Sequence, residues 1–552
     1  MSDISEKIRS AVKISVKEAF EIDAEDNMVM VERPRDPKMG DYSTNIAMRL
    51  AKSLHRKPIE IANDLIPVLQ KNLPEASSVT AAGAGFINFV MSESSLADVI
   101  NKIIEAGDSY GKNNTGNGEK ILVEFVSANP TGDLHCGHAR GAAWGDSICR
   151  LLEASGYDVL REYYVNDAGN QIHMLALSLI ARYNEYFGRP FELPEDGYHA
   201  EDVKNIAVEI AKTEGDKWLD ADENERLEYF KNIGIEKELK KIENDLALYR
   251  VTFNSWVHER MFYENDSARI KKVLNDLKEK GLTYEKDGAL WFRSTQFGDD
   301  KDRVLKKSTG LLTYLTPDIA NHVYKLERGY TKLVDLLGAD HHSYVTRMNC
   351  ALEALGYPKG CLEVDLIQMV RMVDNGVEVK MSKRTGNAIT IRELCEDVGV
   401  DAARYFFVSK EVGTHMDFDM GLARQKTNDN PVYYAQYAYT RMYNILNRED
   451  APEFYMPESY DLLKDPKEMA LLKQISEFPK TVADCAKYRA PNRICGYLQQ
   501  LARDFHSYYN SCRVLDPENP ELTNERMGLV KACMTVMKNA LDLIGVSAPE
   551  KM

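Results

Sequence analysis

The sequence predicts an α/β protein: a doubly wound parallel sheet, preceded by an α+β domain and followed by an all-α helical bundle. Three observations lead to this fold class. Between residues 121 and 373, continuous apolar runs alternate with amphipathic segments, which is typical of parallel strands covered on both faces. Before this region strand and helix patterns are mixed, and after Asp401 helical periodicity dominates. A chain of 552 residues is long enough for about three domains.

Residues 1–112 form the first predicted domain. Its expected elements, in chain order, are a helix over 1–20, a strand over 28–31, a helix within 39–54, a helix from Pro58 and a strand over 86–90. Asp41 or Ser43 is expected to cap the second helix, because both side chains accept hydrogen bonds from backbone N–H groups. The segment 107–120, rich in Gly, Asn and Lys, is the predicted linker.

Residues 113–425 form the predicted sheet domain. The expected strands cover 121–127, 157–165, 332–339 and 363–373, and the expected helices cover about 137–154, 171–183 and 346–355. Parallel strands are joined by helical crossovers, so this alternation predicts a doubly wound sheet. The charged helical segments of about 190–280 interrupt the alternation, and we interpret them as a surface insertion.

Residues 426–552 form the predicted helical domain. Amphipathic segments lead into it and fill it, over 402–409, 432–447, 467–486, 492–509 and 525–544. Helices with one apolar face bury that face against one another, so a bundle is expected.

The formal net charge is −16, from 70 Lys and Arg against 86 Asp and Glu. This balance argues against indiscriminate coating of nucleic acid, but it is compatible with a local basic surface. The nine cysteines include no CxxC pair, so we expect free thiols and no structural metal. No apolar run approaches the roughly 18 residues that a membrane span needs, and no signal peptide is visible, so a cytoplasmic protein without membrane contact is expected.

The first candidate site is NPTGDLHCGH (129–138), which follows the first sheet strand and begins a helix. Helix N-termini at this place offer unsatisfied N–H groups and a positive dipole end, which suit phosphate. His135 and His138 share one helix face, where two imidazoles beside Gly137 can donate hydrogen bonds to a nucleotide triphosphate. Taken alone, an HxxH pair is more often a helix cap or a surface pair.

The second candidate site is VEVKMSKRTGN (377–387). Its lysines, Lys380 and Lys383, enclose Met381 and Ser382. A mobile lysine loop can neutralise a leaving pyrophosphate while charge develops in the transition state. For an isolated KxxK, a solvated basic turn is the simpler interpretation.

The two motifs together resemble the HxGH and KMSK signatures of class I aminoacyl-tRNA synthetases. Residues 123–172, from VEFVSANPTGDLHCGH to VNDAGNQI, are similar to the arginyl-tRNA synthetase signature, and DAARYFF and NPVYYAQYAYTR resemble later blocks of that family. GDYSTNIAMRLAK and GAGFINF resemble its additional N-terminal domain, so the resemblance covers nearly the whole chain. It implies a Rossmann-like catalytic domain, ATP as substrate and Mg²⁺ accompanying the nucleotide. The implied catalytic residues are His135, His138, Lys380 and Lys383, and the implied ATP-binding residues are His135, Gly137, His138, Met381, Ser382 and Lys383.

Glu124 lies in the middle of the apolar strand 121–127, where a carboxylate needs a cationic partner. From the residues alone, an internal Arg or Lys and a bound guanidinium are comparable partners. The resemblance favours the guanidinium of the substrate arginine, whose fork of donors suits a carboxylate. Asn129, just beyond the strand, is expected to hold the amino acid head group.

Tyr314 and Asp318 form a second candidate pair for arginine. Thr316 and Pro317 read as the start of a helix, whose first turn favours an acid at Asp318 for structural reasons alone. The resemblance implies that Tyr314 and Asp318 contact the guanidinium, and it adds Gln171 and Asp167 to the pocket region.

The turn after the third predicted strand departs from the family pattern. Ala339 stands where the family has a pocket glutamine. His341 and His342, which follow it, either face the adenosine or end the preceding strand.

The resemblance also implies contacts with tRNA. The candidates are Phe86 and Asn88 in the first domain, and Tyr433, Tyr434, Gln436, Tyr437 and Arg441 in the helical domain. Aromatic side chains beside cationic ones can stack unpaired bases. Tyrosines at helical spacing usually pack in a core, so we expect some buried and one or two exposed.

The function implied by the resemblance is that of an arginine–tRNA ligase. Such an enzyme condenses L-arginine with ATP to arginyl-adenylate, usually with tRNA bound, and transfers the arginyl group to the 3′ end of tRNA(Arg). We expect a monomer.

Two other classes of protein fit the sequence less well. A small-molecule nucleotidyltransferase would not need the helical tail, and a non-catalytic tRNA-binding paralogue would have lost histidines or lysines that are present here. A cysteine-specific synthetase is disfavoured because the cysteines lack zinc-ligand grouping.

Overall fold

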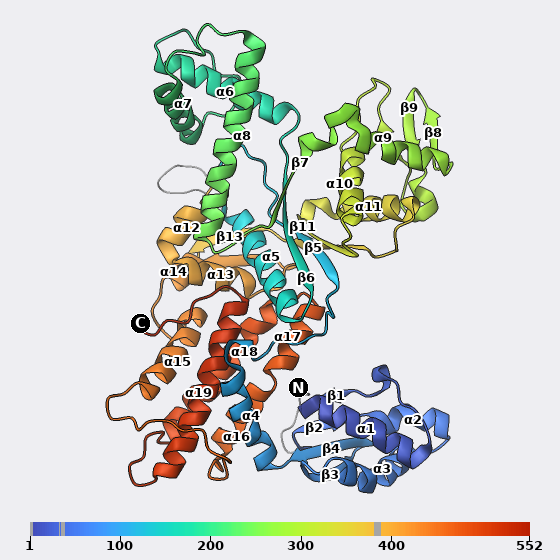
Figure 1. Cartoon of the computed structure of the whole chain (residues 1–552), viewed down its shortest axis with the longest axis vertical. Coiled ribbons are helices and arrows are strands. Elements are labelled where there is room, and N and C mark those ends of the chain that lie inside the picture. Colours follow the sequence, from blue (N-terminus) through green and yellow to red (C-terminus); the bar gives the residue numbers. More distant parts are fainter. Residues whose placement is uncertain (1–3, 33, 35–38, 380–387) are drawn as a thin grey trace.

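The computed structural model describes residues 4–32, 34, 39–379 and 388–552. A parallel sheet occupies the centre of the molecule, with a helical bundle and the N-terminal domain on one side and two lobes on the other (Figure 1). In the described part of the chain, no helix is long and apolar enough to cross a bilayer.

The N-terminal domain is a four-stranded antiparallel sheet covered by helices, with strand order β1-β2-β4-β3. Its elements are α1 (Ile4–Phe20), β1 (Val31–Glu32), β2 (Tyr42–Thr44), α2 (Ile46–Leu54), α3 (Pro58–Asn72), β3 (Ala76–Ala82) and β4 (Phe86–Met91). The predicted cap by Asp41 or Ser43 is wrong, because residues 42–44 pair with β4 as a strand and α2 begins after Asn45. Asp41 instead accepts a hydrogen bond from the backbone N of Met91.

The central sheet has the order β12-β11-β5-β6-β7, and all its strands are parallel. Its strands are β5 (Lys120–Glu124), β6 (Asp158–Val165), β7 (Ser255–His258), β11 (Lys332–Gly338) and β12 (Leu362–Ile367). From β5 the chain builds the sheet in one direction through β6 and β7, and then returns to add β11 and β12 on the other side. This reversal places a crevice at the carboxyl ends of β5 and β11, where open α/β sheets bind ligands.

Helices and a second small sheet surround the central sheet. The helices are α5 (Cys136–Ala154), α6 (Asn170–Tyr186), α7 (Glu201–Glu214), α8 (Glu223–Leu248), α9 (Glu264–Glu279), α10 (Leu315–Glu327) and α11 (His342–Leu355). One lobe carries α6, α7 and much of α8, and the other carries α9 to α11 with the antiparallel strands β8 (Thr283–Lys286), β9 (Ala289–Phe292) and β10 (Arg303–Lys306) (Figure 1).

Three predicted strand assignments need correction. The predicted insertion 190–280 contains β7, a strand of the central sheet. The predicted strand 363–373 is two strands, because the chain leaves the sheet after β12 and continues as β13 (Val370–Asp374) in a separate small sheet. Strands also continue beyond Asp401: β13 pairs with β14 (Val377–Glu378) and with β15 (Met416–Asp419).

The C-terminal region is the predicted helical bundle. Its helices, with those that lead into it, are α12 (Ile391–Val398), α13 (Val400–Val408), α14 (Met420–Ala423), α15 (Pro431–Leu446), α16 (Pro466–Ser476), α17 (Phe478–Lys487), α18 (Asn492–Ser511) and α19 (Pro520–Leu543). The predicted helix 467–486 is divided into α16 and α17, since Pro479 lacks an N–H and sits in the first turn of the second helix.

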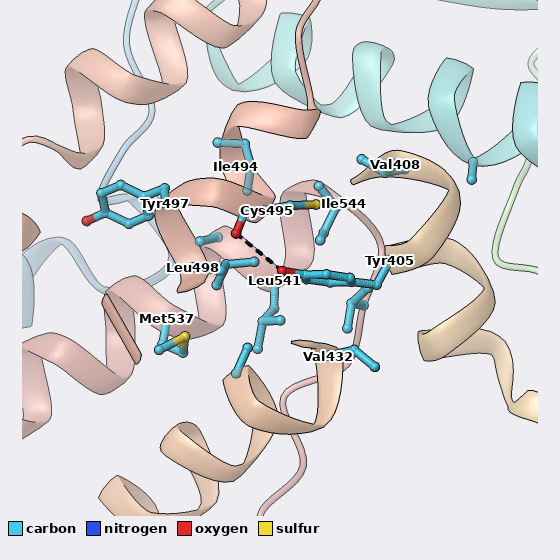
Figure 2. Packing of buried hydrophobic residues seen from close by; sticks show 14 of the residues in the cluster. Tyr405, Val408, Val432, Ile494, Cys495, Tyr497, Leu498, Met537, Leu541 and Ile544 are labelled. Atoms are coloured by element: carbon cyan, nitrogen blue, oxygen red, sulfur yellow. Dashed lines mark hydrogen bonds between the residues drawn. The ribbon is translucent and has the colours of Figure 1, made fainter. Parts of the chain in front are cut away.

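The bundle is joined to its neighbours by packing and hydrogen bonds. Figure 2 shows Tyr405 of α13 among apolar side chains of the bundle, with its hydroxyl donating to the Cys495 carbonyl at 3.2 Å. Helix α4 (Glu93–Ala106), which follows the N-terminal domain, packs against α16 and α19. The Tyr42 hydroxyl of the N-terminal domain donates to Glu477 at 2.8 Å. All nine cysteines are free thiols, and eight of them are buried.

Candidate functional site

The site begins where β5 ends. Just beyond the end of β5, Val126 and Ser127 adopt φ angles of 69° and 38°. Such angles are rare for residues with a side chain, and especially for a β-branched valine. This turn takes the chain out of the sheet and into the crevice. The Ser127 hydroxyl donates to Glu124 at 3.0 Å and accepts from the backbone N of Tyr164 at 3.1 Å, which fixes the turn against β6.

His135 and His138 form the N-terminus of α5, as the HxGH spacing predicted. His135 is the N-cap residue: its Nδ1 accepts from the backbone N of Gly137 at 3.1 Å, and His138 Nδ1 accepts from the backbone N of His135 at 3.2 Å. Because both Nδ1 atoms are acceptors, each neutral ring carries its proton on Nε2. The cap and the phosphate-binding interpretations are therefore compatible, because capping leaves both Nε2–H groups free to donate.

Electrostatics keep the two histidines of this motif neutral, and close packing surrounds Gly137. Burial and the neighbouring His135 lower the pKa of His138 to about 4, and burial lowers that of His135. The two rings stack with centroids 3.9 Å apart. A Cβ at Gly137 would lie 2.9 Å from His135 Cε1, so a side chain there would displace the ring.

The predicted residues of the lysine loop, Lys380, Met381, Ser382 and Lys383, lie outside the described residues. The segment that follows the loop is placed directly against the histidine motif. Cys136 donates its backbone N–H to Ile389 O at 3.0 Å, and Ile391 donates to Leu134 O at 2.8 Å. The chain that directly follows the second signature segment is therefore a neighbour of the first.

Glu124 has an internal partner. It is buried, and its Oε2 lies 2.5 Å from Lys325 Nζ, which also contacts Asp335 at 3.1 Å. His322 Nε2 lies 2.7 Å from the other oxygen of Asp335. Of the two partners considered for Glu124, the internal lysine is the one present, so this carboxylate is not left unpaired in the core.

Two of the residues predicted to bind the substrate arginine lie at a cavity of about 570 Å³. Tyr314 and Gln171 line it, and Tyr314 is 88% exposed at its mouth. Glu259, which the sequence did not single out, also lines it and accepts from the Tyr263 hydroxyl at 3.4 Å. Glu259 follows the carboxyl end of β7, so it was missed because that strand was missed.

Asp318 completes an acidic region around this cavity. It lies one helical turn after Tyr314 on α10 and is half-buried. Burial raises the pKa of Asp318 to about 7; the carboxylates of Glu259 and Glu124 also raise it, and His322 opposes them. Burial likewise raises the pKa of Glu259. Close carboxylates with raised pKa values make a site that gains from a bound cation.

Asp167, placed in the pocket region by resemblance, lies behind the pocket wall. Its side chain is fully buried, and it accepts from His258 Nδ1 at 2.7 Å and from the backbone N of Arg260 at 3.0 Å. These two donors are the residues on either side of Glu259. Asp167 therefore holds the segment that presents Glu259 to the cavity.

The remaining residues of the crevice are exposed. Asn129 lies in the loop between β5 and α5, and its carbonyl accepts from the backbone N of Thr131. Ala339 begins a short 3₁₀ turn after β11, followed by His341 and His342 at the start of α11. Both histidines thus follow the strand end and stand at the crevice edge. In the described part of the chain, no three His, Cys, Asp or Glu side chains gather in a way that would hold a metal ion.

A second cavity, of about 840 Å³, lies in the helical bundle between α15 and the end of α18. Arg441 lies over the rings of Tyr437 and Tyr509, with its guanidinium carbon 4.5 and 5.0 Å from their centroids. Tyr433 stacks on Tyr437. Arg448, just after α15, and Tyr509 of α18 also line the cavity, and neither was among the predicted contacts.

Two predicted tRNA contacts are buried in structural roles. Gln436 donates to Asp401 at 2.8 Å and to the Ser547 carbonyl at 2.9 Å, so both of its amide protons are used inside the protein. Asn88 is 6% exposed on β4 between two other strands. Phe86, on the same strand, is exposed, and Tyr434 is half-buried against the ring of His506.

A parallel sheet whose switch point carries an HxGH motif at a helix N-terminus, bonded to the segment that follows the KMSK motif in the chain, defines a class I aminoacyl-tRNA synthetase. Three family models match the chain: the arginyl tRNA synthetase N-terminal domain at residues 5–91, the catalytic domain of class I tRNA synthetases (R) at 99–420 and the DALR anticodon binding domain at 435–552. The chain belongs to the arginyl-tRNA synthetase family.

Relatives and solved structures agree with this assignment. An arginine–tRNA ligase of Bacillus subtilis is 49% identical over 100% of this chain and 99% of its own length, and one of Bacillus anthracis is 50% identical over 100% and 98%. A putative arginyl-tRNA synthetase from Campylobacter jejuni is 34% identical, with a TM-score of 0.76 over 84% of this chain and 100% of that one. The Thermus thermophilus arginyl-tRNA synthetase, 22% identical, has the same fold over the whole of both chains, with a TM-score of 0.76.

Proposed function

We propose that this chain is an arginine–tRNA ligase, which converts L-arginine and ATP to arginyl-adenylate and pyrophosphate and then transfers the arginyl group to the 3′ end of tRNA(Arg). The observation that carries the proposal is the meeting of two features in one crevice. A pair of neutral histidines stands at the N-terminus of α5, and at the carboxyl end of the same sheet Glu259 lines a cavity, with the carboxylate of Asp318 near enough to interact with it. One feature suits phosphate, and the other suits a guanidinium.

In the activation step, an oxygen of the arginine carboxylate attacks the α-phosphorus of ATP, and the bond to pyrophosphate breaks in line. His135 and His138 donate their Nε2–H groups to the phosphate oxygens, and Gly137 allows the nucleotide close to the backbone. We assign neutralisation of the leaving pyrophosphate to Lys380 and Lys383. These lysines would reach the nucleotide together with Met381 and Ser382. No covalent enzyme intermediate is needed, so catalysis rests on positioning and electrostatics.

Mg²⁺ would enter with the nucleotide, bound to its phosphates. This fits the donor set of the histidine motif, which offers N–H donors to phosphate oxygens and no carboxylate cage.

For arginine, we assign the guanidinium to Asp318 and Glu259. Two carboxylates can accept the fork of guanidinium donors and neutralise its charge. Tyr314 and Gln171 would complete the mouth of the cavity, and Asn129 would hold the head group. Glu124, paired with Lys325, would act mainly by adding negative potential behind Asp318.

For tRNA, we assign unpaired anticodon bases to the cavity that holds Tyr437, Arg441 and Tyr509, with Tyr433 and Tyr434 beside it. Stacked rings with an arginine between them provide base-stacking platforms. We assign a second contact to Phe86 in the N-terminal domain. The three functional units would be residues 1–112, 113–425 and 426–552, acting together in a cytoplasmic monomer.

ATP–pyrophosphate exchange with each amino acid, in the presence and absence of tRNA, tests the proposal. Arginine is expected to drive exchange, and tRNA(Arg) is expected to stimulate it. Exchange driven by an amino acid other than arginine would overturn the substrate assignment.

A further inference from the structure

Helix α8 connects one lobe of the molecule to the nucleotide-binding crevice. It runs from that lobe down to α12 (Figure 1), and its last turns contact Asp133 of the first signature motif and Arg392, which follows the second. Lys241 and Asp245 lie four residues apart in these turns and so share one face of the helix.

Lys241 contacts three carboxylates from three segments. Its Nζ lies 2.5 Å from Asp202 of α7, 2.7 Å from Glu238 of α8 and 3.2 Å from Asp133 in the loop between β5 and α5. The Lys241 side chain is about three-quarters buried, and that of Glu238 is fully buried. A cation enclosed by acids in this way is held in one position, so it can fix the segments around it.

Asp133 is two residues before His135, in the loop whose far end is bonded to Ile389 and Ile391 through Cys136 and Leu134. Pro130 and Leu134 are buried, while Asn129 and Asp133 are exposed. The ion pair with Lys241 therefore ties the exposed stretch of the loop to the body of the protein.

The same face of α8 also reaches the helix that follows the second motif. Asp245 pairs with Arg392, in the first turn of α12, and this turn follows the segment that is bonded to Leu134 and Cys136. One helix thus holds the flanks of both signature segments.

We propose that Lys241 is a positioning residue for ATP: by holding Asp133, it fixes the loop that carries His135 and His138 in the geometry that receives the nucleotide. This inference rests on the proposed function, because it requires those histidines to bind ATP. Lys241 itself would not touch the nucleotide.

The test is ATP–pyrophosphate exchange with Lys241→Met in the full-length chain. The KM for ATP is expected to rise about tenfold, as when a supporting residue behind a binding group is lost, while the KM for arginine stays unchanged. Lys241→Arg should restore the KM for ATP, since a guanidinium can bridge the same acids.

The matched control is Lys237→Met. Lys237 lies one turn earlier and joins α8 to α7 through Glu209 at 2.6 Å without contacting the loop. Its KM for ATP should equal that of the wild type.

Because Lys241→Met leaves Glu238 buried without its cation, Asp133→Asn supplies a second approach from the loop side. It should raise the KM for ATP by a similar factor, and the double variant should be no worse than either single one. Folded Lys241→Met and Asp133→Asn proteins with the wild-type KM for ATP would overturn the inference, and so would an equal rise in the KM for arginine. If His138→Ala itself leaves the KM for ATP and the rate of exchange unchanged, the histidine assignment in the proposed function has failed instead.

Discussion

At the scale of single residues, the chemistry of the site depends on which ring nitrogen of each histidine carries the proton. The backbone N–H groups of Gly137 and His135 occupy Nδ1 of His135 and His138, and burial lowers the pKa of both rings. Both imidazoles are therefore neutral Nε2–H donors near pH 7, and under the proposed function they would bind phosphate as hydrogen-bond donors rather than as cations.

This protonation state leads to a graded prediction for His138. His138→Ala should lower the kcat of ATP–pyrophosphate exchange about 100-fold, the typical cost of one lost donor to a developing charge. His138→Gln should retain more activity, since its terminal amide presents N–H close to the position of Nε2. Steady-state exchange with saturating arginine measures this. Equal losses in the two variants would contradict the tautomer assignment.

Asp318 leads to a prediction for pH. Its pKa is raised to about 7, mainly by burial, and the guanidinium needs the ionised form. The kcat/KM for arginine should therefore rise with pH up to about 7 and level off above it. Since Glu259 contributes to the raised pKa, Glu259→Gln should move the break to lower pH. A pH profile of exchange under limiting arginine is the measurement, and a flat profile from pH 6 to pH 8 would exclude this role for Asp318.

At the scale of elements, the ends of β6 and β7 together build the cavity proposed for arginine. Asp167 follows β6 and binds both neighbours of Glu259, which follows β7. The carboxylate therefore depends on two strands that are adjacent in the sheet but separated by the α6–α8 segment along the chain.

The dependence of Glu259 on Asp167 can be measured with a double-mutant cycle. Asp167→Asn should raise the KM for arginine about tenfold without changing the KM for ATP, because it loosens a supporting contact. Combined with Glu259→Gln, the effects should be clearly less than additive. Asp158→Asn, at the exposed start of β6, is the matched control and should behave as the wild type. Additive effects of Asp167 and Glu259 would show that they act independently.

Local sequence patterns predict some of these strands and helices but not others. The strands at β5, β6 and β11 and the helix at α5 were predicted, because long apolar runs and a glycine-rich turn mark them clearly. Strand β7 has four residues within a charged region, and its membership of the sheet depends on pairing with β6, which no local pattern reports. The position of Glu259 could not be predicted for the same reason. The burial of Gln436 could not be predicted either, because its hydrogen-bond partners, Asp401 and the Ser547 carbonyl, are distant in the chain.

At the scale of the whole molecule, a buried ionic junction joins the catalytic domain to the bundle. Asp146 of α5 pairs with Arg404 of α13 and with Arg161 of β6. Arg404 also donates to the carbonyls of Ile544, just after α19, and of Tyr249, just after α8. This buried carboxylate, neutralised by the arginines around it, therefore holds parts of the molecule together that are distant in the chain.

Removing the central carboxylate should weaken the whole assembly. Asp146→Asn leaves buried arginines without their counter-charge, so we expect a loss of about 3–5 kcal/mol of stability. Thermal unfolding followed by circular dichroism would show this as a lower melting temperature. The control, Asp220→Asn, removes the exposed partner of Arg189 and should melt as the wild type does. Equal melting of the two variants would argue against a structural role for the junction.

The central claim is that Asp318 and Glu259 select arginine by its charge, and one ratio tests it most directly. This is the kcat/KM for arginine divided by that for citrulline, its neutral isostere, in ATP–pyrophosphate exchange with tRNA present. We predict that the Asp318→Asn/Glu259→Gln double variant lowers this ratio at least about 100-fold relative to the wild type, since a site built around a charged group strongly rejects an analogue that lacks it. A double variant that still prefers arginine as strongly as the wild type would contradict the account.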